Sequence, residues 1–234
     1  MDNTSKEQYV YQVFQSISKG YDRANRRISL GFEKGFKRML LTRLKDSTPY
    51  GGAVLDVCCG TGDITLFLAD RRPDLEVTGL DFSPAMLSKA RWRNKKKKRD
   101  NVHFRRGNAL ELPFDDDSFE AVCISFGLRN TADYFRVLQE MRRVTKPGGF
   151  IYCLDSFVPE CVVIKPFYTL YFRHIMPLLG GGIHHRREYL WLYHSTKHFL
   201  SRKELKKLFV RLGSQEVQDK DKMFGACVLV WGHK

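Results

Sequence analysis

A glycine turn with a carboxylate on either side is the group of residues in this chain best suited to hold a ligand. The apolar residues 53–58 contain Asp56 and lead into the turn Gly60-Thr61-Gly62. Glycine has no Cβ, so its backbone can turn sharply and approach a ligand closely. Asp81 ends the next apolar stretch about 20 residues later, where nucleotide-binding folds place a carboxylate against ribose hydroxyls. The spacing therefore predicts a ribose site.

The same turn argues against a dinucleotide. A dinucleotide fingerprint has a third glycine three positions after the second, and that position is Thr65 here. A ligand with a ribose but no pyrophosphate fits better, and S-adenosylmethionine is the natural candidate. Two glycines also occur in an ordinary α/β turn, so this interpretation needs support from other motifs.

The elements around these residues alternate between strand and helix. Strands are expected at residues 53–58, 76–80, 102–106, 119–126 and 150–154, with helical segments between them. Strands separated by helices predict βαβ units and a parallel, doubly wound sheet of the α/β class. Ligands bind such sheets outside the carboxyl ends of the strands. Gly60, Asp81, Asn108 and Ser125 all fall at or beside expected strand ends, so we expect them to converge.

Flanking segments complete a single expected domain. Residues 1–48 carry apolar residues at helical spacing over 8–20 and again over 32–40, which predicts a helical cap in front of the core at 52–155. Residues 156–200 are aromatic and interrupted by prolines, as expected of a lid. Residues 201–234 predict a helix followed by strands, the last at 226–231.

Composition favours a globular cytoplasmic protein. Of the 234 residues, 43% are apolar and 28% are charged, and no uncharged apolar run reaches the roughly 18 residues of a membrane-spanning helix. The first residues are polar, unlike a signal peptide. The six cysteines form no CxxC pair and no metal-type spacing with histidine, so we expect reduced thiols in the core and no metal site.

A net charge of +14 calls for an acidic partner or a solvated basic face. Its densest part is the run at residues 95–99, Lys-Lys-Lys-Lys-Arg. No aromatic platform for stacking bases accompanies the run, so nucleic acid is not expected. An anionic membrane surface remains, which would place the protein at the inner face of the cell membrane.

Four further stretches carry a resemblance to a known family. They are residues 21–25 (Tyr-Asp-Arg-Ala-Asn) with Ile28-Ser29, residues 56–63 (Asp-Val-Cys-Cys-Gly-Thr-Gly-Asp), residues 107–114 (Gly-Asn-Ala-Leu-Glu-Leu-Pro-Phe), and residues 125–130 (Ser-Phe-Gly-Leu-Arg-Asn) continuing through 143–149. Together they resemble the ubiquinone/menaquinone biosynthesis C-methyltransferases, which are class I methyltransferases. The similarity covers nearly the whole chain, and the block at 125–130 is its most specific part.

The resemblance implies a Rossmann-like fold and S-adenosylmethionine-dependent C-methylation of a polyprenylated quinol, most simply demethylmenaquinol. A soluble aromatic acceptor and a nucleic-acid-binding relative are the alternatives, and a homodimer is left open. The family usually has other residues at five positions, which keeps the exact acceptor open: Ala24, Glu33, Phe36, Asp155 and Val230.

The resemblance also assigns roles to residues. Thr61 and its loop would hold the methionine moiety, Asp81 the ribose, and Asn108 with Ala109 the adenine, while Ser125 would close the cavity. The full expected cofactor set is Asp56, Gly60, Thr61, Gly62, Asp81, Asn108, Ala109 and Ser125.

Arg129, Asn130 and Asp155 are the expected catalytic residues. Carbon methylation needs a phenolate, and the permanent charge of Arg129 would stabilise it, since an arginine is no base. Asn130 would orient Arg129, and Asp155 would either hold Arg129 or take the proton. A surface salt bridge is the alternative for Arg129. Other candidate bases are His174, His184, His185 and His194, and the expected apolar wall is Tyr168, Tyr171, Phe172 and Trp191.

Overall fold

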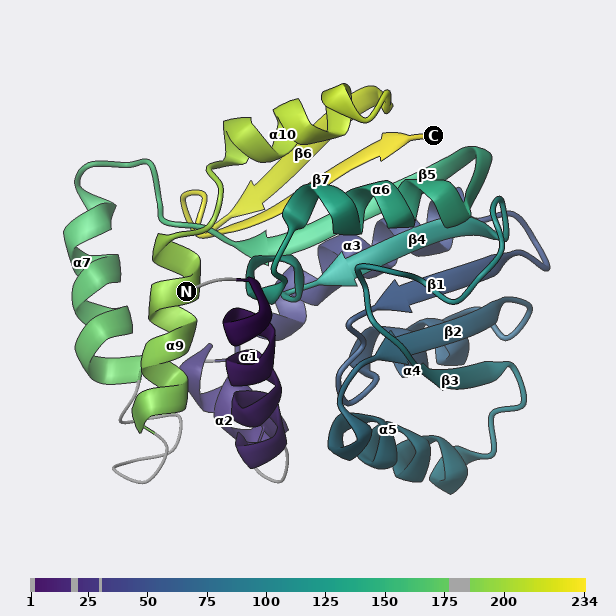
Figure 1. Cartoon of the computed structure of the whole chain (residues 1–234), viewed down its shortest axis with the longest axis horizontal. Helices are drawn as coiled ribbons and strands as arrows, with labels where there is room; N and C mark the ends of the chain where they lie inside the picture. Colours follow the sequence, from purple (N-terminus) through teal and green to yellow (C-terminus); the bar gives the residue numbers. More distant parts are fainter. Residues whose placement is uncertain (1–2, 18–20, 30, 177–185) are drawn as a thin grey trace.

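The computed structural model describes residues 3–17, 21–29, 31–176 and 186–234. Within them the strands form one seven-stranded sheet in the order β3-β2-β1-β4-β5-β7-β6 (Figure 1). The strands are β1 Ala53–Val57, β2 Glu76–Asp81, β3 Val102–Arg106, β4 Phe119–Ser125, β5 Thr145–Ser156, β6 Gln215–Lys222 and β7 Cys227–His233. The first five run parallel, and β7 is antiparallel to both of its neighbours. The predicted doubly wound α/β sheet is confirmed.

Helices cover both faces of this sheet. They are α1 Asn3–Ile17, α2 Tyr21–Ile28, α3 Glu33–Ser47, α4 Asp63–Arg71, α5 Pro84–Lys97, α6 Tyr134–Val144, α7 Ile164–Leu170, α9 Arg186–Lys197 and α10 Arg202–Arg211, with a 3-10 turn η1 Leu128–Asn130 and a π-helical turn η2 Tyr171–Ile175. α3 and α4 bury their apolar residues on one face, and α6 and α10 on the other. The central strands are apolar along their length because both of their faces are covered.

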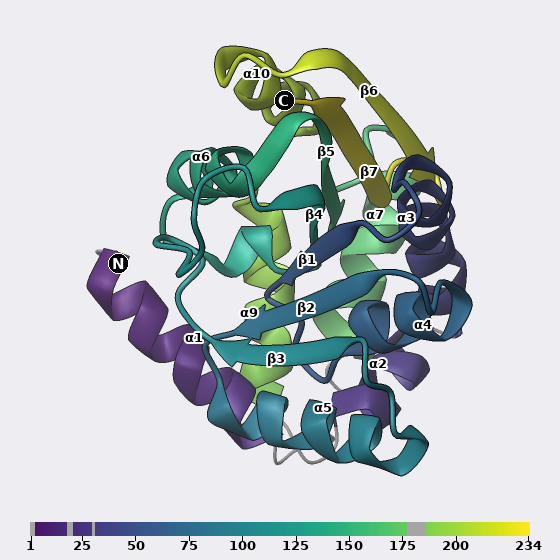
Figure 2. The same ribbon diagram turned by 90° about the vertical axis from the view of Figure 1, so that its right-hand side faces the viewer.

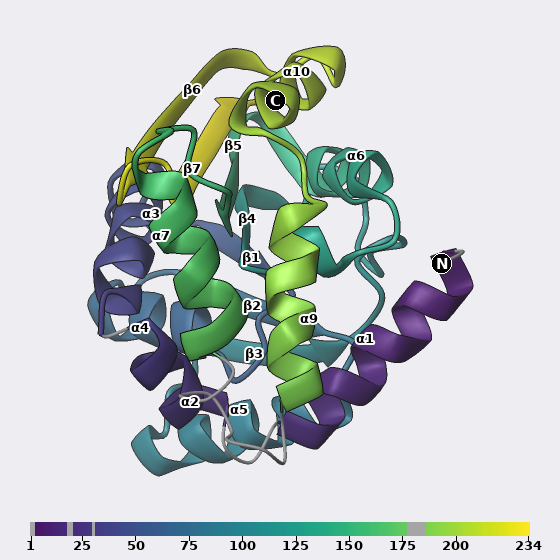
Figure 3. The same ribbon diagram turned by 90° about the vertical axis from the view of Figure 1, so that its left-hand side faces the viewer.

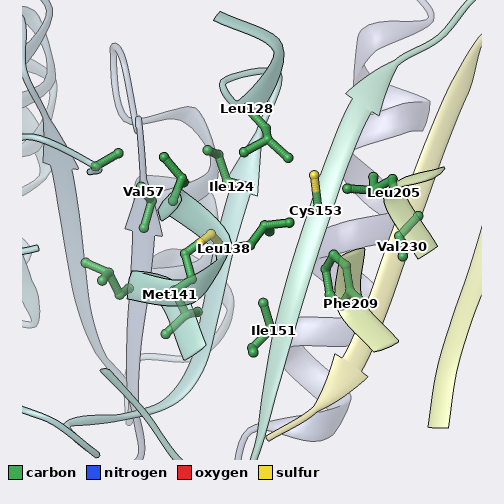
Figure 4. Close-up of a cluster of buried hydrophobic side chains, with 14 of the residues drawn as sticks. Val57, Ile124, Leu128, Leu138, Met141, Ile151, Cys153, Leu205, Phe209 and Val230 are labelled. Carbon is green, nitrogen blue, oxygen red and sulfur yellow. The ribbon is translucent and has the colours of Figure 1, made fainter. Parts of the chain in front are cut away.

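The apolar core between the sheet and helices α6 and α10 is built from residues that helical and strand periodicity select. Leu138 and Met141 of α6, together with Phe209 of α10, pack against Ile151 and Val230 of the sheet (Figure 4). All five side chains are almost fully buried. Packing of this kind fixes where the sheet strands end, and those ends carry the site.

Several expected boundaries move. β5 begins at Thr145, five residues before the expected start at 150. It bulges against β4, where Phe119 pairs with Thr145 but Ala121 pairs with Phe150. Cys58 and Phe126 fall just outside β1 and β4 with φ near 57°. The sequence did not predict α2, which is mostly polar, or the charged edge strand β6 as a separate element. Charged residues suit an exposed sheet edge.

α1, α2, α7 and α9 gather at the carboxyl ends of the parallel strands (Figures 1 and 3). Tyr171 Oη donates to the carbonyl of Ile28 at 2.5 Å, which ties η2 to α2. Lys6 Nζ donates to the carbonyl of Thr131 at 2.6 Å, which seats α1 on the loop after β4. Viewed from the side, α1 also lies next to α5 (Figure 2), and Ser83 Oγ at the start of α5 donates to Gln15 of α1. These four helices therefore cover the carboxyl ends of the parallel strands.

Candidate functional site

A first cavity, of about 180 Å³, lies over the ends of β1, β2 and β4. Gly60, Asp81, Asn108, Ala109 and Ser125 all line it, as the sequence predicted. Phe82 and Met86 add apolar surface, and Val10 of α1 closes it from above. A carboxylate among apolar and small polar lining residues suits a nucleoside.

Asp81 is the polar centre of the first cavity. Its Oδ2 accepts from the backbone N–H of Gly60 at 2.8 Å, and its Oδ1 accepts from that of Ser83 at 2.9 Å. Burial raises the pKa of Asp81 to about 6. The N-cap of α5 is Ser83, whose side chain accepts from the N–H of Met86, so capping is not the role of Asp81. Asp81 instead bridges the glycine turn and the next loop, and each oxygen can still accept from a ribose hydroxyl.

Asp56 and Gly62 support the turn from below. Asp56 Oδ2 accepts from the N–H and the hydroxyl of Thr65, at 3.2 Å and 2.6 Å, and burial raises the pKa of Asp56 to about 7. Gly62 has φ +80°, and a Cβ there would lie 3.0 Å from the Phe104 ring. Neither residue is among the described residues that line the cavities. The contacts described give both residues a structural role, and their expected cofactor contact stays a prediction.

Asn108 uses its side chain locally. Its Oδ1 accepts from the N–H of Leu110 at 3.0 Å, which shapes the loop after β3. Ala109 is buried beside it, and both residues face the first cavity. The loop therefore offers backbone and a small apolar side chain to a flat ligand.

A second and larger cavity, of about 450 Å³, adjoins the first. The two share Cys58, Gly60, Ser125 and Phe126, so they meet above the ends of β1 and β4. Thr61 lines the second cavity, as do Tyr168, Tyr171 and Phe172 of the predicted aromatic wall. Trp191 was expected in that wall, but it is not one of the described residues that line the cavity. Its Nε1 instead donates to Asn130 Oδ1 at 3.3 Å.

Arg129 lines the second cavity, and it is buried. Its Nη1 donates to Asp155 and, at 2.9 Å, to the carbonyl of Phe126. Its backbone N–H donates to Asp155 Oδ2 at 3.2 Å. Asp155 has no exposed surface, so this is a buried ion pair, and the surface salt bridge considered for Arg129 is ruled out. Of the two roles considered for Asp155, holding Arg129 is the one that the contacts favour.

Asn130 meets Arg129 through a shared acceptor. Its Nδ2 donates to the carbonyl of Phe126 at 3.3 Å, the same carbonyl that Arg129 binds. Trp191 of α9 holds its other end. Asn130 thereby links α9 to the loop that carries Arg129. Its expected role in orienting Arg129 stays a prediction.

Comparison with known proteins assigns this fold and site to a family. The sequence profile described as the ubiE/COQ5 methyltransferase family matches residues 2–234. The chain belongs to the ubiE/COQ5 methyltransferase family. It is 44% identical to a demethylmenaquinone methyltransferase of Shouchella clausii over 98% of both chains. It is 41% identical to one of Staphylococcus aureus, over the whole of this chain and 96% of the relative.

Solved structures agree on the fold of this ubiE/COQ5 methyltransferase. An S-adenosylmethionine-dependent methyltransferase from Thermotoga maritima aligns with a TM-score of 0.66 at 20% identity, covering 96% of this chain and 99% of the other. A phosphoethanolamine N-methyltransferase of Haemonchus contortus, solved with S-adenosyl-L-methionine, aligns with a TM-score of 0.59 at 21% identity, over 79% of this chain and 38% of the other. The expected class I methyltransferase fold is confirmed.

The unusual residues of this family member separate into two groups. Glu33 and Phe36 line the second cavity. Val230 was expected on the substrate side, but it is fully buried in β7 and pairs with Cys153. The side chain of Ala24 lies outside the described residues. Of the five positions, Asp155 and Val230 line neither described cavity, and Glu33 and Phe36 line the second.

Histidines supply no base to the described site. His174 and His194 are exposed, and neither is among the described residues lining the second cavity. His184 and His185 lie outside the described residues. The described residues that line the two cavities therefore include no histidine.

One feature of the site has no signature that a single sequence can show. Cys58 and Phe126 both have φ of 57°, a left-handed conformation that costs energy for residues with a Cβ. A Cβ on Gly127 would lie 2.7 Å from that of Cys58, so the loops after β1 and β4 touch at backbone distance. This contact brings the glycine turn and Arg129 together.

Proposed function

We propose that this protein methylates a ring carbon of a polyprenylated quinol, most simply demethylmenaquinol, with S-adenosylmethionine as its cofactor. The observation that carries the proposal is the buried Arg129–Asp155 pair at a large cavity rich in aromatic side chains, which adjoins a smaller cavity lined by Asp81. The names of the relatives from Shouchella clausii and Staphylococcus aureus support the same acceptor.

The first cavity fits the cofactor. Asp81 would accept from the ribose hydroxyls, while Phe82, Met86 and Ala109 would enclose the adenine. Thr61 lies in the turn toward the second cavity, where Arg93 donates to its carbonyl at 2.9 Å and steadies it for the methionine moiety. Bound S-adenosylmethionine supplies an electrophilic methyl group on its sulfonium.

Arg129 prepares the acceptor for that methyl group. A phenol has a pKa near 10, so little phenolate forms at neutral pH without help. A phenolate oxygen beside Arg129 is stabilised by a fixed positive charge, and its electron density raises the nucleophilicity of the adjacent ring carbon. Asp155 keeps the guanidinium in place but leaves the pair net neutral, so the developing oxyanion is stabilised by orientation more than by net charge.

Product analysis tests this proposal directly. The protein is incubated with methyl-labelled S-adenosylmethionine and, in parallel, demethylmenaquinol, soluble naphthalenediols and soluble monophenols. We expect label on a ring carbon of the prenylated quinol at the highest kcat/KM. Faster turnover of the soluble phenols would replace the proposed acceptor with a soluble aromatic one, and label on oxygen would overturn C-methylation.

A membrane-facing surface would give such an acceptor access. Among the described residues, no helix is long and apolar enough to cross a bilayer. α7 and the turn before it, however, expose Val162, Val163, Phe167 and Leu170, and Phe167 is 68% exposed while also lining the second cavity. Lys165 and Arg173 lie on the same segment and are exposed. We propose that this segment contacts anionic lipid and admits the prenyl chain.

The basic run that first suggested a membrane is less suited to it. Lys97 and Arg99 donate to Asp70 at 2.9 Å and 2.6 Å, so part of the charge is neutralised within the protein. The run covers the last turn of α5 and the two residues after it, at the amino ends of the strands and away from both cavities (Figure 1). We therefore place the proposed contact on α7.

A further inference from the structure

One hydroxyl group in the wall of the second cavity is buried without a hydrogen-bond partner among the described residues. Tyr168 of α7 lines this cavity, yet its Oη is shielded from solvent and has no hydrogen-bond partner among the described residues. Buried polar groups are almost always hydrogen-bonded, because an unpaired one loses its interaction with water and gains nothing in return. The cost implies that a partner arrives with a ligand.

Tyr171, on the next turn of the same segment, makes a useful contrast. Its Oη donates to the carbonyl of Ile28 at 2.5 Å, so that hydroxyl has a structural task. Both tyrosines line the second cavity. The fold thus satisfies one phenol of the lid and leaves its neighbour unsatisfied.

Tyr168 also lies within electrostatic reach of Arg129. Burial raises the pKa of Tyr168 well above its ordinary value, and the positive charge of Arg129 only partly opposes this. The hydroxyl therefore keeps its proton at neutral pH and can only donate to an anion. Tyr168 and Arg129 line the same cavity, so a protonated phenol and a guanidinium are both available there to donate to one anion.

We propose that Tyr168 Oη donates a hydrogen bond to the same acceptor oxygen that Arg129 stabilises, which completes an oxyanion site for a phenolate. The ligand class is an aromatic ring with an ionisable hydroxyl beside the methylated carbon. Because Tyr168 belongs to the lid, the oxyanion site is complete only when α7 is in place over the cavity. This inference rests on the proposed function.

Tyr168→Phe tests the inference, with Tyr171→Phe as the matched control. Activity on demethylmenaquinol is measured from pH 6 to pH 10, together with cofactor Kd and Tm. We expect Tyr168→Phe to lower kcat at pH 7 at least tenfold and to shift the activity profile to higher pH, where solvent supplies more phenolate. Cofactor Kd should not change. Tm should not fall, since the removed hydroxyl has no partner in the free protein.

Tyr171→Phe should behave in the opposite way, with a lower Tm and an unshifted pH profile. Wild-type kcat and profile in Tyr168→Phe would overturn the inference, as would a fall in activity that only accompanies a fall in Tm. A wild-type protein that does not methylate the quinol would instead overturn the proposed function, and this arm is read before any variant.

Discussion

At the scale of single residues, the site is a set of polar groups whose burial gives them their properties. Arg129 and Asp155 are shielded together, and removing either would leave an uncompensated charge. Asp81 is shielded on its own, which is why its pKa rises to about 6. Burial of each group costs free energy in the protein without ligands, and we expect contacts with cofactor and acceptor to offset that cost.

Arg129→Lys should separate orientation from charge. Lysine keeps the positive charge but has a single nitrogen, which cannot hold Asp155 and the Phe126 carbonyl while also facing a ligand. We expect kcat to fall about a hundredfold, the order seen for loss of one oxyanion donor. Cofactor affinity should stay the same because the loss occurs in the transition state. Full activity on the quinol would refute the role, and loss of cofactor binding would make Arg129 structural.

Asp81 should make cofactor binding depend on pH. Ribose hydroxyls donate to the ionised carboxylate, whose pKa in the free protein is about 6. Affinity should therefore rise as pH increases from 5 to 7 and level off above that. Asp81→Ala should weaken binding at pH 7 at least tenfold, about 1.4 kcal/mol. Calorimetry across this range measures both effects. Asp81→Asn, which cannot ionise, should give a flat profile, and a wild-type profile that is equally flat would count against the ribose contact.

At the scale of elements, the site depends on loops held from behind. Asp56 anchors the start of α4 through Thr65, and Gly127 lets the loop after β4 touch Cys58. α1 and α9 then lock the same loop through Lys6 and Trp191. Asp56, Lys6 and Trp191 line neither cavity, yet they fix loops whose residues do.

Asp56→Asn should stabilise the protein increasingly as pH rises. Burial raises the folded-state pKa of Asp56 to about 7, against roughly 4 for an unfolded aspartate. The unfolded chain loses this proton first, so the contribution of Asp56 to stability is full below about pH 4 and is lost as pH rises to 7. The free energy of unfolding, measured in urea at pH 5 and pH 8, should shift in favour of the variant at pH 8. A difference that does not vary with pH would contradict the buried, protonatable carboxyl.

At the scale of the whole molecule, α7 both covers the second cavity and carries the proposed lipid contact. α7 contributes Tyr168 to the second cavity and exposes Val163 and Phe167 outward. A bilayer against this face would cover apolar surface that water otherwise contacts, which is favourable in proportion to the area. Docking would also hold the lid close to its acceptor.

Vesicle binding should therefore depend on α7. Val162→Ser/Val163→Ser should weaken binding to anionic vesicles more than Lys95→Ser/Lys96→Ser does. The two lysines lie at the amino ends of the strands, opposite to the carboxyl ends that α7 covers. Binding should fall as salt rises, since the Debye length is only about 10 Å at 0.1 M. Sedimentation with anionic and neutral vesicles measures this. Equal loss in both variants would place the contact elsewhere, and no binding by the wild type would exclude it.

The sequence by itself determined the sheet, the family and several of the residues that line the first cavity. Periodicity and glycine turns are local patterns, and strand ends in a parallel sheet must meet at one edge, so Gly60, Asp81, Asn108, Ala109 and Ser125 were found before any coordinates. The motif at 125–130 likewise selected Arg129.

Only the tertiary structure decided what these residues contact. Asp56 ends a buried strand just as Asp81 does, yet it faces Thr65 and not a cavity. Val230 packs in the core although its position was expected to face the acceptor, and Trp191 binds Asn130 although its type suited the apolar wall. The direction of a side chain and the partner it meets depend on segments far away in the chain. Because these contacts form only when lid, cap and sheet pack together, local sequence carries no record of them.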